Sequence, residues 1–518
     1  MKMRLSSRFN FASDAIVRAS LGIFVVMFLV KGIGYAEKIV LAYYFGTSME
    51  VDVYNVISAT ILSIFVFFRE LIEPGFLNTF LAARNKQNLQ SAWHIFNLFA
   101  RIILVSTILL TIAVELFPAQ TIELFAPGFE HEKKAMAVSI IRIAFPACIF
   151  LALSGLTNIT LNAFKNFVFA ASADLVFRGV GIVCLIVLTP YIGFYSAGVG
   201  LLIGAVAKLL VHLSKLHANV SLQKVRLEKD HRNNIVRLTW PLLLGVSFSQ
   251  FNTIIDNVFA SYLQNGAISA LSYSKKIVEL PILIFPYLLS TVLFPYLSQS
   301  YIDGEHDKTR LLLVRSLKWI VIFFVPLSII FLVYSHAIVA LIFQRGAFTA
   351  ASTALTQEPF AVYTTGMLFF ALETVLVVYY FARNNTLLPI LLGMACVVVN
   401  VAITYFTIDR LGYLSIPLAA VISKTLKVGI LMAIVVVKDK VPVSNAVAFS
   451  FKVGAASLLF YGIHLAFNYV FIFEYASLLM KLLHMTAACA IALAAYVFTV
   501  YRLRVFEGLP SWQALRRQ

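Results

Sequence analysis

The sequence predicts an all-α polytopic membrane protein, on three observations. Of its 518 residues, 61% are hydrophobic and only 13% are charged. Apolar runs of about 20 residues, enough to span a bilayer as a helix, recur along the chain. Lys and Arg gather in alternate connections between those runs. A soluble domain carries roughly 25% charged residues because water must wet its surface, so the composition excludes a soluble or disordered protein.

About fourteen transmembrane helices are predicted from these runs. Gly32 and Gly34 are expected to interrupt the first helix, Pro146 the fourth, and Pro281 and Pro286 the eighth. Such breaks are tolerated at membrane depth only where protein or a wet cavity satisfies the freed backbone groups. The predicted helix centres lie near residues 32, 62, 104, 147, 178, 204, 248, 283, 322, 366, 397, 424, 459 and 490.

The net charge of +17, from 41 Lys and Arg against 24 Asp and Glu, sets the predicted orientation. About two dozen basic residues fall on one side of the membrane and about four on the other, among them Lys133 and Lys134. The positive-inside rule then places both termini in the cytoplasm. Because the basic residues are scattered between apolar runs, nucleic acid is not an expected partner.

An internal repeat divides the chain near its middle. The motif AFKN at residues 163–166 lies opposite FARN at residues 381–384, and 381 − 163 = 218. Phe125 meets Phe343 at the same offset. Each copy holds about six helices, an even number, so both copies share one orientation, as in the parallel repeats of transporters. We therefore predict two parallel six-helix lobes around a central cavity, plus two C-terminal helices.

The basic connections and the apolar runs together set the predicted domain boundaries. These are a cytoplasmic N-terminal tail at 1–19, an N-lobe at 20–217, a basic cytoplasmic linker at 218–235, a C-lobe at 236–437, the C-terminal helices at 446–503 and a cytoplasmic tail at 504–518. The first segment is basic and has no small-residue cleavage site, which is typical of a tail and not of a signal peptide.

Lysines inside the apolar runs are the candidate binding residues. An ionisable side chain in the bilayer costs at least roughly 2.5–3.5 kcal/mol, so each one needs a reason. Lys31 in the first half and the neighbouring pair Lys275 and Lys276 in the second half lie in corresponding regions. Together they would attract a doubly negative group, because ammonium side chains bind phosphate as point charges. The alternative is that each lysine pairs with a nearby carboxylate, Glu37 or Glu279.

Other buried charges have simpler expected explanations. Arg69 and Glu73 lie near a predicted cytoplasmic helix end, where they can pair or reach the membrane surface. Asp174 and Arg178 are spaced i, i+4 and are expected to pair on one helix face. Glu373 lies deep in a run and has no obvious partner nearby in the sequence.

No motif predicts an enzyme, a cofactor or a metal site. The sequence contains no HExxH, no GxxxxGK[ST] and no GxSxG. The four cysteines all lie inside apolar runs without CxxC spacing, so they indicate neither a disulfide framework nor a metal site.

Several segments resemble the MurJ/MviN lipid II flippase family. They include FGTSMEVDVYN at 45–55, LNAFKNFVFA at 161–170, SYSKKIVELP at 272–281 and FQRGAFTA at 343–350. The resemblance runs in order from about residue 20 to residue 440. It implies two lobes around a cationic cavity and a lipid-facing groove for a polyprenyl tail.

The implied activity is movement of lipid II, the undecaprenyl-pyrophosphate-linked peptidoglycan precursor, from the inner to the outer leaflet by alternating access. The implied partners are this lipid-linked glycan and the membrane lipids, and the protein is expected to be a monomer in the bacterial cytoplasmic (inner) membrane.

Family positions carry over unevenly to this chain. Lys31 and Lys276 stand where the family has a functional Arg, Asp52 matches a family acid, and Glu37 reverses the sign of a family Arg. Asp256 is a candidate for binding a coupling ion. The residues predicted to contact substrate are Lys31, Lys38, Asp52, Arg69, Glu73, Lys275, Lys276 and Glu279.

Other functions are open at this point. The first alternative is a flippase for another polyprenyl-linked oligosaccharide, such as an O-antigen or exopolysaccharide unit. A cation-coupled multidrug exporter of the same superfamily should carry acidic residues in its cavity instead. A membrane scaffold leaves the buried charges unexplained, and a membrane glycosyltransferase needs a catalytic loop that the short connections do not offer.

Overall fold

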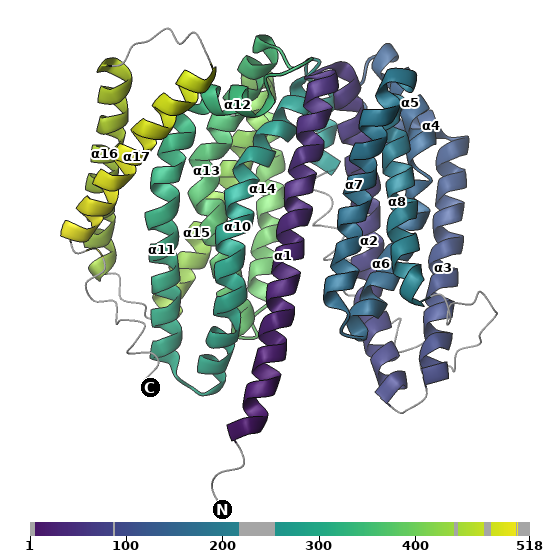
Figure 1. Cartoon of the computed structure of the whole chain (residues 1–518), viewed down its shortest axis with the longest axis horizontal. Helices are drawn as coiled ribbons and strands as arrows, with labels where there is room; N and C mark the ends of the chain where they lie inside the picture. Colours follow the sequence, from purple (N-terminus) through teal and green to yellow (C-terminus); the bar gives the residue numbers. More distant parts are fainter. Residues whose placement is uncertain are drawn as a thin grey trace, which may run out of the picture. The chain divides into compact units, whose positions relative to one another are not determined.

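A computed structural model describes residues 6–85, 89–216, 254–439, 444–470, 478–503 and 505 (Figure 1). Within these ranges the regular structure is entirely helical, as predicted. The helices are α1 (Ser6–Phe45), α2 (Met49–Asn85), α3 (Leu89–Leu116), α4 (Pro118–Phe125), α5 (His131–Ala144), α6 (Ala147–Ala163), α7 (Phe167–Ile192), α8 (Tyr195–Leu216), α10 (Ala267–Ile302), α11 (His306–Val333), α12 (Ser335–Phe343), α13 (Ala350–Ala382), α14 (Leu387–Leu411), the 3₁₀ turn η2 (Gly412–Leu414), α15 (Ser415–Asp439), α16 (Ser444–Val470) and α17 (Leu478–Arg502).

Many of these helices are long and apolar enough to cross a membrane. Nine helical stretches among the described residues pass this test, and one of them, Leu387–Asp439, contains both α14 and α15. The helices α5 and α6 pass the test only together, as a pair bent by 44°, and Pro146 lies in the break between them, as predicted. The predicted helix centred near residue 248 falls outside the described residues. The all-α membrane fold is confirmed.

The predicted breaks in the first and eighth spans were wrong. Helix α1 runs for 40 residues through Gly32 and Gly34, and α10 runs for 36 residues through Pro281 and Pro286. Glycine removes no backbone hydrogen bond, and neighbouring groups can re-satisfy the carbonyl that a proline frees in a membrane helix. Gly34 instead serves packing, because a Cβ there would lie 2.8 Å from Nη1 of Arg178.

The chain forms two compact units. Unit 1 is Met1–Tyr273 with Phe343–Ser352, and unit 2 is Ser274–Ile342 with Thr353–Gln518. The first turns of α10 therefore belong to unit 1. The predicted linker lies outside the described residues, so the boundary between the lobes stays a prediction.

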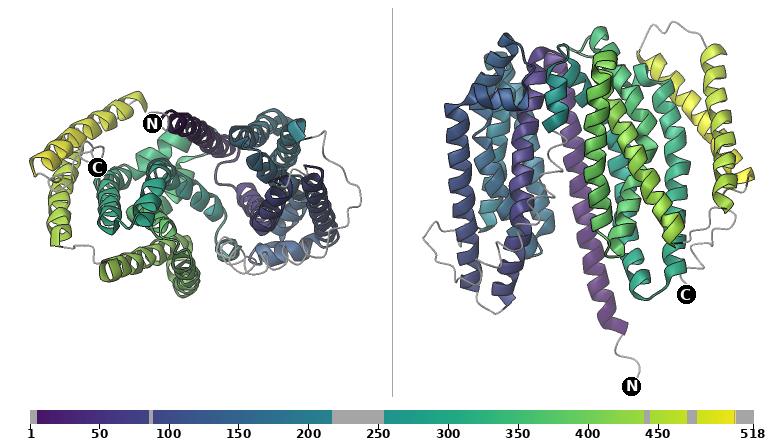
Figure 2. Two further views of the ribbon diagram at one scale, coloured as in Figure 1. Left: turned by 90° about the horizontal axis from the view of Figure 1, so that it is seen from below. Right: turned by 180° about the vertical axis from the view of Figure 1, so that it is seen from behind.

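In unit 1, α1 packs along α7, and α7 packs on α8 (Figures 1 and 2). Helices α2, α3 and α6 enclose an aromatic core. Phe76, Phe80 and Phe96 are fully buried there beside Trp93. In unit 2, α14 packs against α15, and α16 packs against α17 and α11. Phe460 of α16 and Tyr496 of α17 are buried in one apolar cluster, against which residues of α11 pack.

Two backbone turns recur in the two halves of the chain. Lys165 and Asn384 both adopt left-handed backbone, with φ of 61° and 57°, and 384 − 165 = 219. Gly193 and Gly412 have φ of 57° and 55°, and 412 − 193 = 219. The first turn in each half is closed by an equivalent backbone hydrogen bond, of 2.9 Å and 3.0 Å. The repeat therefore extends to backbone detail, and α6–α8 correspond to α13–α15.

Candidate functional site

Asp52, near the start of α2, is fully buried and accepts four hydrogen bonds. Its Oδ2 accepts from Nζ of Lys133 at 2.9 Å and from the backbone N–H of Gly266 at 2.8 Å. Its Oδ1 accepts from the backbone N–H of Ser269 at 2.8 Å and from its hydroxyl at 2.5 Å. We call these four residues the Asp52 junction.

The junction is electrostatically matched. Helix α10 begins at Ala267, so the Asp52 carboxylate lies at its N-terminus, where N–H groups lack helical partners and the helix dipole is positive. Lys133, on α5, is 3% exposed, and its ammonium lies 4.7 Å from the ring centroid of Phe129. The junction therefore ties together the starts of α2, α5 and α10.

Lys133 was missed by sequence reasoning, which placed it in an outward-facing connection. The adjacent Lys134 behaves as such a residue, since it pairs with Glu123 at the surface. Nothing local in the sequence separates the two lysines, because the partner of Lys133 lies 81 residues away.

The α1–α2 turn meets the segment that follows α12. The backbone N–H of Ala347 donates to the carbonyl of Tyr43 at 2.8 Å, and the hydroxyl of Thr47 donates to that of Ser352 at 2.8 Å. Gly46 has φ of 61°, and a Cβ there would lie 2.5 Å from the carbonyl oxygen of Ala347, so only glycine fits. Two of the segments that carried the family resemblance therefore contact each other.

A second ion pair joins α1 to α7. Nη1 of Arg178 lies 2.9 Å from Oε2 of Glu37, and both residues line a pocket with Tyr54. The predicted pairing of Asp174 with Arg178 was wrong, because Asp174 pairs instead with Lys208 of α8 at 2.7 Å. Asp174 and Arg178 therefore each pair with a residue of a neighbouring helix, α8 and α1, and not with each other along α7.

The other predicted contact residues of unit 1 lie on α1 and α2. Nζ of Lys38 donates to the side-chain oxygen of Asn55 at 2.6 Å. Lys31 is exposed on α1. Nε of Arg69 lies 3.7 Å from Oε2 of Glu73, and both side chains are about half exposed. Unit 1 thus gathers lysines and ion pairs along α1 and the adjoining helices.

The remaining predicted residues lie on α10 and just before it. Nζ of Lys276 lies 3.7 Å from Oε2 of Glu279, while Lys275 is exposed. These three residues belong to unit 2. Asp256 lies in a helical segment of unit 1 and is half-buried.

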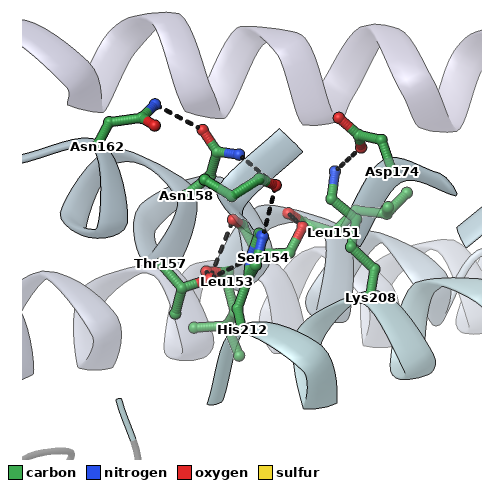
Figure 3. A network of polar contacts seen from close by, with 10 residues as sticks. Leu151, Leu153, Ser154, Thr157, Asn158, Asn162, Asp174, Lys208 and His212 are labelled. Carbon is green, nitrogen blue, oxygen red and sulfur yellow. Dashed lines mark hydrogen bonds and ion pairs between the residues drawn. The ribbon is translucent and has the colours of Figure 1, made fainter. Parts of the chain in front are cut away.

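Figure 3 shows a polar network between α6, α7 and α8 that sequence reasoning did not find. The ring of His212 is fully buried, with Nδ1 2.8 Å from the hydroxyl of Thr157 and Nε2 3.1 Å from the carbonyl of Ala170. Lys208 lies one helical turn before His212 on α8, and it pairs with Asp174 of α7 (Figure 3). The network stabilises the packing of three helices with matched polar groups.

Glu373 on α13 has partners that its sequence surroundings did not reveal. Its Oε2 lies 2.7 Å from Nζ of Lys424, and its Oε1 lies 2.6 Å from Nζ of Lys427, both on α15. We call these three residues the Glu373 cluster. It sets two positive charges against one negative charge in the interior of unit 2.

The fold defines a multi-span helical membrane protein, and solved transporters share it. A solved structure described as lipid II flippase MurJ in an inward closed conformation is 23% identical, covers 93% of this chain and 99% of its own, and gives a TM-score of 0.75. An inward-facing multidrug resistance MATE transporter is 12% identical, covers 80% of this chain and 94% of its own, and gives a TM-score of 0.69.

Sequence comparison narrows the class to one family. The family described as "Lipid II flippase MurJ" matches residues 41–494. A probable lipid II flippase MurJ of Buchnera aphidicola is 24% identical over 501 residues, which cover 94% of this chain and 97% of the relative. Another, from Rhizobium meliloti, is 28% identical over 328 residues, 61% of each chain. The chain belongs to the MurJ lipid II flippase family.

Proposed function

We propose that this protein moves lipid II from the inner to the outer leaflet of the bacterial cytoplasmic (inner) membrane. The observation that carries the proposal is the family match over residues 41–494. The alternative of a flippase for another polyprenyl-linked oligosaccharide shares the same fold and the same need for cationic residues. No covalent bond changes in either process, so the protein acts as a transporter and not as an enzyme.

The proposed mechanism is alternating access between two lobes. Lys31, Lys38, Lys275 and Lys276 attract the pyrophosphate as point charges, while the polyprenyl tail stays in the lipid. Glu279 pairs with Lys276, and Arg69 and Glu73 pair with each other on α2, as further contacts for the polar head group. The equilibrium between the inward-open and outward-open states shifts because the anionic head group binds the two states with different affinity.

The Asp52 junction lies within unit 1 and joins the starts of three helices through a buried ion pair and two backbone hydrogen bonds. In this mechanism it keeps these helices together while the lobes move. Membrane potential can add roughly 2.3 kcal/mol per charge moved through 100 mV, and Asp256 is our candidate for a coupling-ion ligand.

Both termini are proposed to be cytoplasmic and the protein to act as a monomer, with lobes at 20–217 and 236–437. Support for this orientation is the excess of Lys and Arg in alternate connections. Accessibility of single cysteines introduced at each terminus to a membrane-impermeant thiol reagent tests it, and labelling from outside intact cells would overturn it.

Complementation of a strain depleted of its lipid II flippase tests the function. We expect growth with the wild-type protein and loss of growth with Lys31→Ala or Lys276→Ala at equal protein level. Lys308→Ala is the control, because Lys308 pairs with Glu305 at the start of α11, away from the proposed contact residues.

Failure of well-expressed, correctly inserted wild-type protein would overturn the lipid II assignment. Rescue of a strain depleted of an O-antigen flippase would then support the alternative substrate. Growth of both lysine variants at wild-type rate would contradict the cationic mechanism. The substrate assignment would then depend on complementation by the wild-type protein alone.

A further inference from the structure

Two buried lysines occupy equivalent positions in the internal repeat, but the carboxylate that pairs with the first has no equivalent beside the second. At the offset of 219 residues, Lys208 of α8 corresponds to Lys427 of α15, since 427 − 208 = 219. At the same offset Asp174 of α7 corresponds to Gly393 of α14. Lys208 is 4% exposed and Lys427 is 8% exposed, so both copies bury this ammonium.

In the first copy the lysine has a carboxylate beside it, supplied by α7. Nζ of Lys208 lies 2.7 Å from Oδ1 of Asp174, and the ammonium also lies 4.8 Å from the ring centroid of Phe65. One positive charge meets one negative charge. This site is internally neutral and complete.

In the second copy the corresponding carboxylate is missing and its space is left open. A Cβ built on Gly393 would lie 3.5 Å from Nζ of Lys427, and it would meet no other heavy atom of the described residues within 4 Å outside α14's own backbone. A side chain at residue 393 would therefore reach Lys427 as Asp174 reaches Lys208. Gly393 leaves a gap beside a buried ammonium.

The charge of the second copy is also unbalanced. Lys427 pairs with Glu373 of α13, but the same carboxylate is shared with Lys424, so two ammonium groups face one carboxylate. An ammonium offers three donors and binds anions as a point charge. The side chain of Lys424 is 44% exposed, which gives an anion a way to reach the cluster.

We propose that Lys424, Lys427 and the gap at Gly393 form a binding slot for the phosphate group of a lipid. The anion would stand where Asp174 stands in the first copy and would balance the extra positive charge. Gly393 is six residues after the start of α14 (393 − 387 = 6), or about 9 Å along the helix, within reach of lipid head groups. The phosphate belongs either to the transported polyprenyl pyrophosphate, which rests on the proposed function, or to a bilayer phospholipid.

The test fills the gap with the missing carboxylate. The full-length protein is purified in detergent, and retained lipid is measured by native mass spectrometry with three probes: undecaprenyl pyrophosphate, phosphatidylglycerol and uncharged undecaprenol. We expect Gly393→Asp to weaken retention of one or both phosphate lipids at least tenfold, and to leave undecaprenol retention unchanged. Gly393→Ala, which adds volume without charge, should stay within about twofold of wild type.

Lys424→Gln provides a second variant that leaves the buried pair of Lys427 and Glu373 in place. Loss of undecaprenyl pyrophosphate assigns the slot to the substrate, and loss of phosphatidylglycerol alone assigns it to the bilayer. Unchanged retention of both phosphate lipids in folded Gly393→Asp and Lys424→Gln would overturn the slot and leave a purely structural cluster. Because retention is measured without transport, failure of the lipid II assignment is recognised separately, by complementation with wild-type protein.

Discussion

Asp52 is a fully buried carboxylate and Glu373 a mostly buried one, and their charges are compensated in different ways. Asp52 meets one lysine, two backbone N–H groups and a hydroxyl. Among the described residues, Glu373 meets two lysines and no other hydrogen-bond donor, and one of these lysines is partly exposed. The Asp52 junction, whose charges balance, joins helices. The Glu373 cluster has one more positive charge than negative charge, and a ligand can neutralise that excess. A buried ion therefore indicates binding only where its charges do not balance within the protein.

Removal of the Asp52 side chain should have the largest effect on stability. Asp52→Ala leaves Lys133 buried without its carboxylate, which costs about 3–5 kcal/mol. We expect a large fall in the thermal unfolding temperature of the purified protein and loss of growth in complementation. Lys134→Ala is the matched control, because its ammonium pairs at the surface. An unfolding temperature equal to that of the control would show that the junction does not hold the helices.

Neutralisation of Glu373 should have an intermediate effect on stability. Glu373→Gln leaves two ammonium groups facing one neutral amide, with an expected loss of about 1–3 kcal/mol. Lys424 can turn toward water, and the amide oxygen of the new Gln still accepts a hydrogen bond from the buried Lys427, so the loss should be smaller than for Asp52→Ala. Thermal unfolding in the presence of added pyrophosphate checks this prediction. The anion should stabilise the variant more than the wild type, and equal stabilisation of both would argue against an accessible excess of charge.

The smallest effect is expected at Arg69. Its pair with Glu73 is spaced i, i+4 on α2, and the two side chains are 44% and 40% exposed. Such pairs contribute about 0.3–0.5 kcal/mol, so Arg69→Ala should barely change the unfolding temperature. If growth in complementation is lost while stability is kept, Arg69 contacts substrate. If neither changes, the residue belongs only to the helix surface.

Hydrophobic runs and charge patterning were enough to predict the membrane fold and the break at Pro146, because both depend on the local sequence. The repeat was also visible, since the turns near Lys165 and Asn384 fall inside the matched motifs. The breaks expected in α1 and α10 were wrong, because local helix propensity yields to packing between helices.

Ion-pair partners were the least predictable feature. Lys133 finds Asp52 across 81 residues, and Lys427 finds Glu373 across 54. Only the packing of separate helices decides such pairs, and short spacing misled the interpretation of Asp174. Family resemblance pointed to Asp52, Lys31 and Lys276, but it carried no information on the Glu373 cluster.

The left-handed turns shared by the two halves indicate that the chain arose by duplication of one unit. Lys165 and Asn384, like Gly193 and Gly412, keep the same backbone in both halves, and the lysine pair Lys208 and Lys427 is kept with them. The carboxylate on α7 has no counterpart on α14. An ancestral six-helix unit with these turns and this lysine accounts for the shared features. The two copies now balance the same lysine with carboxylates from different helices, α7 in one half and α13 in the other.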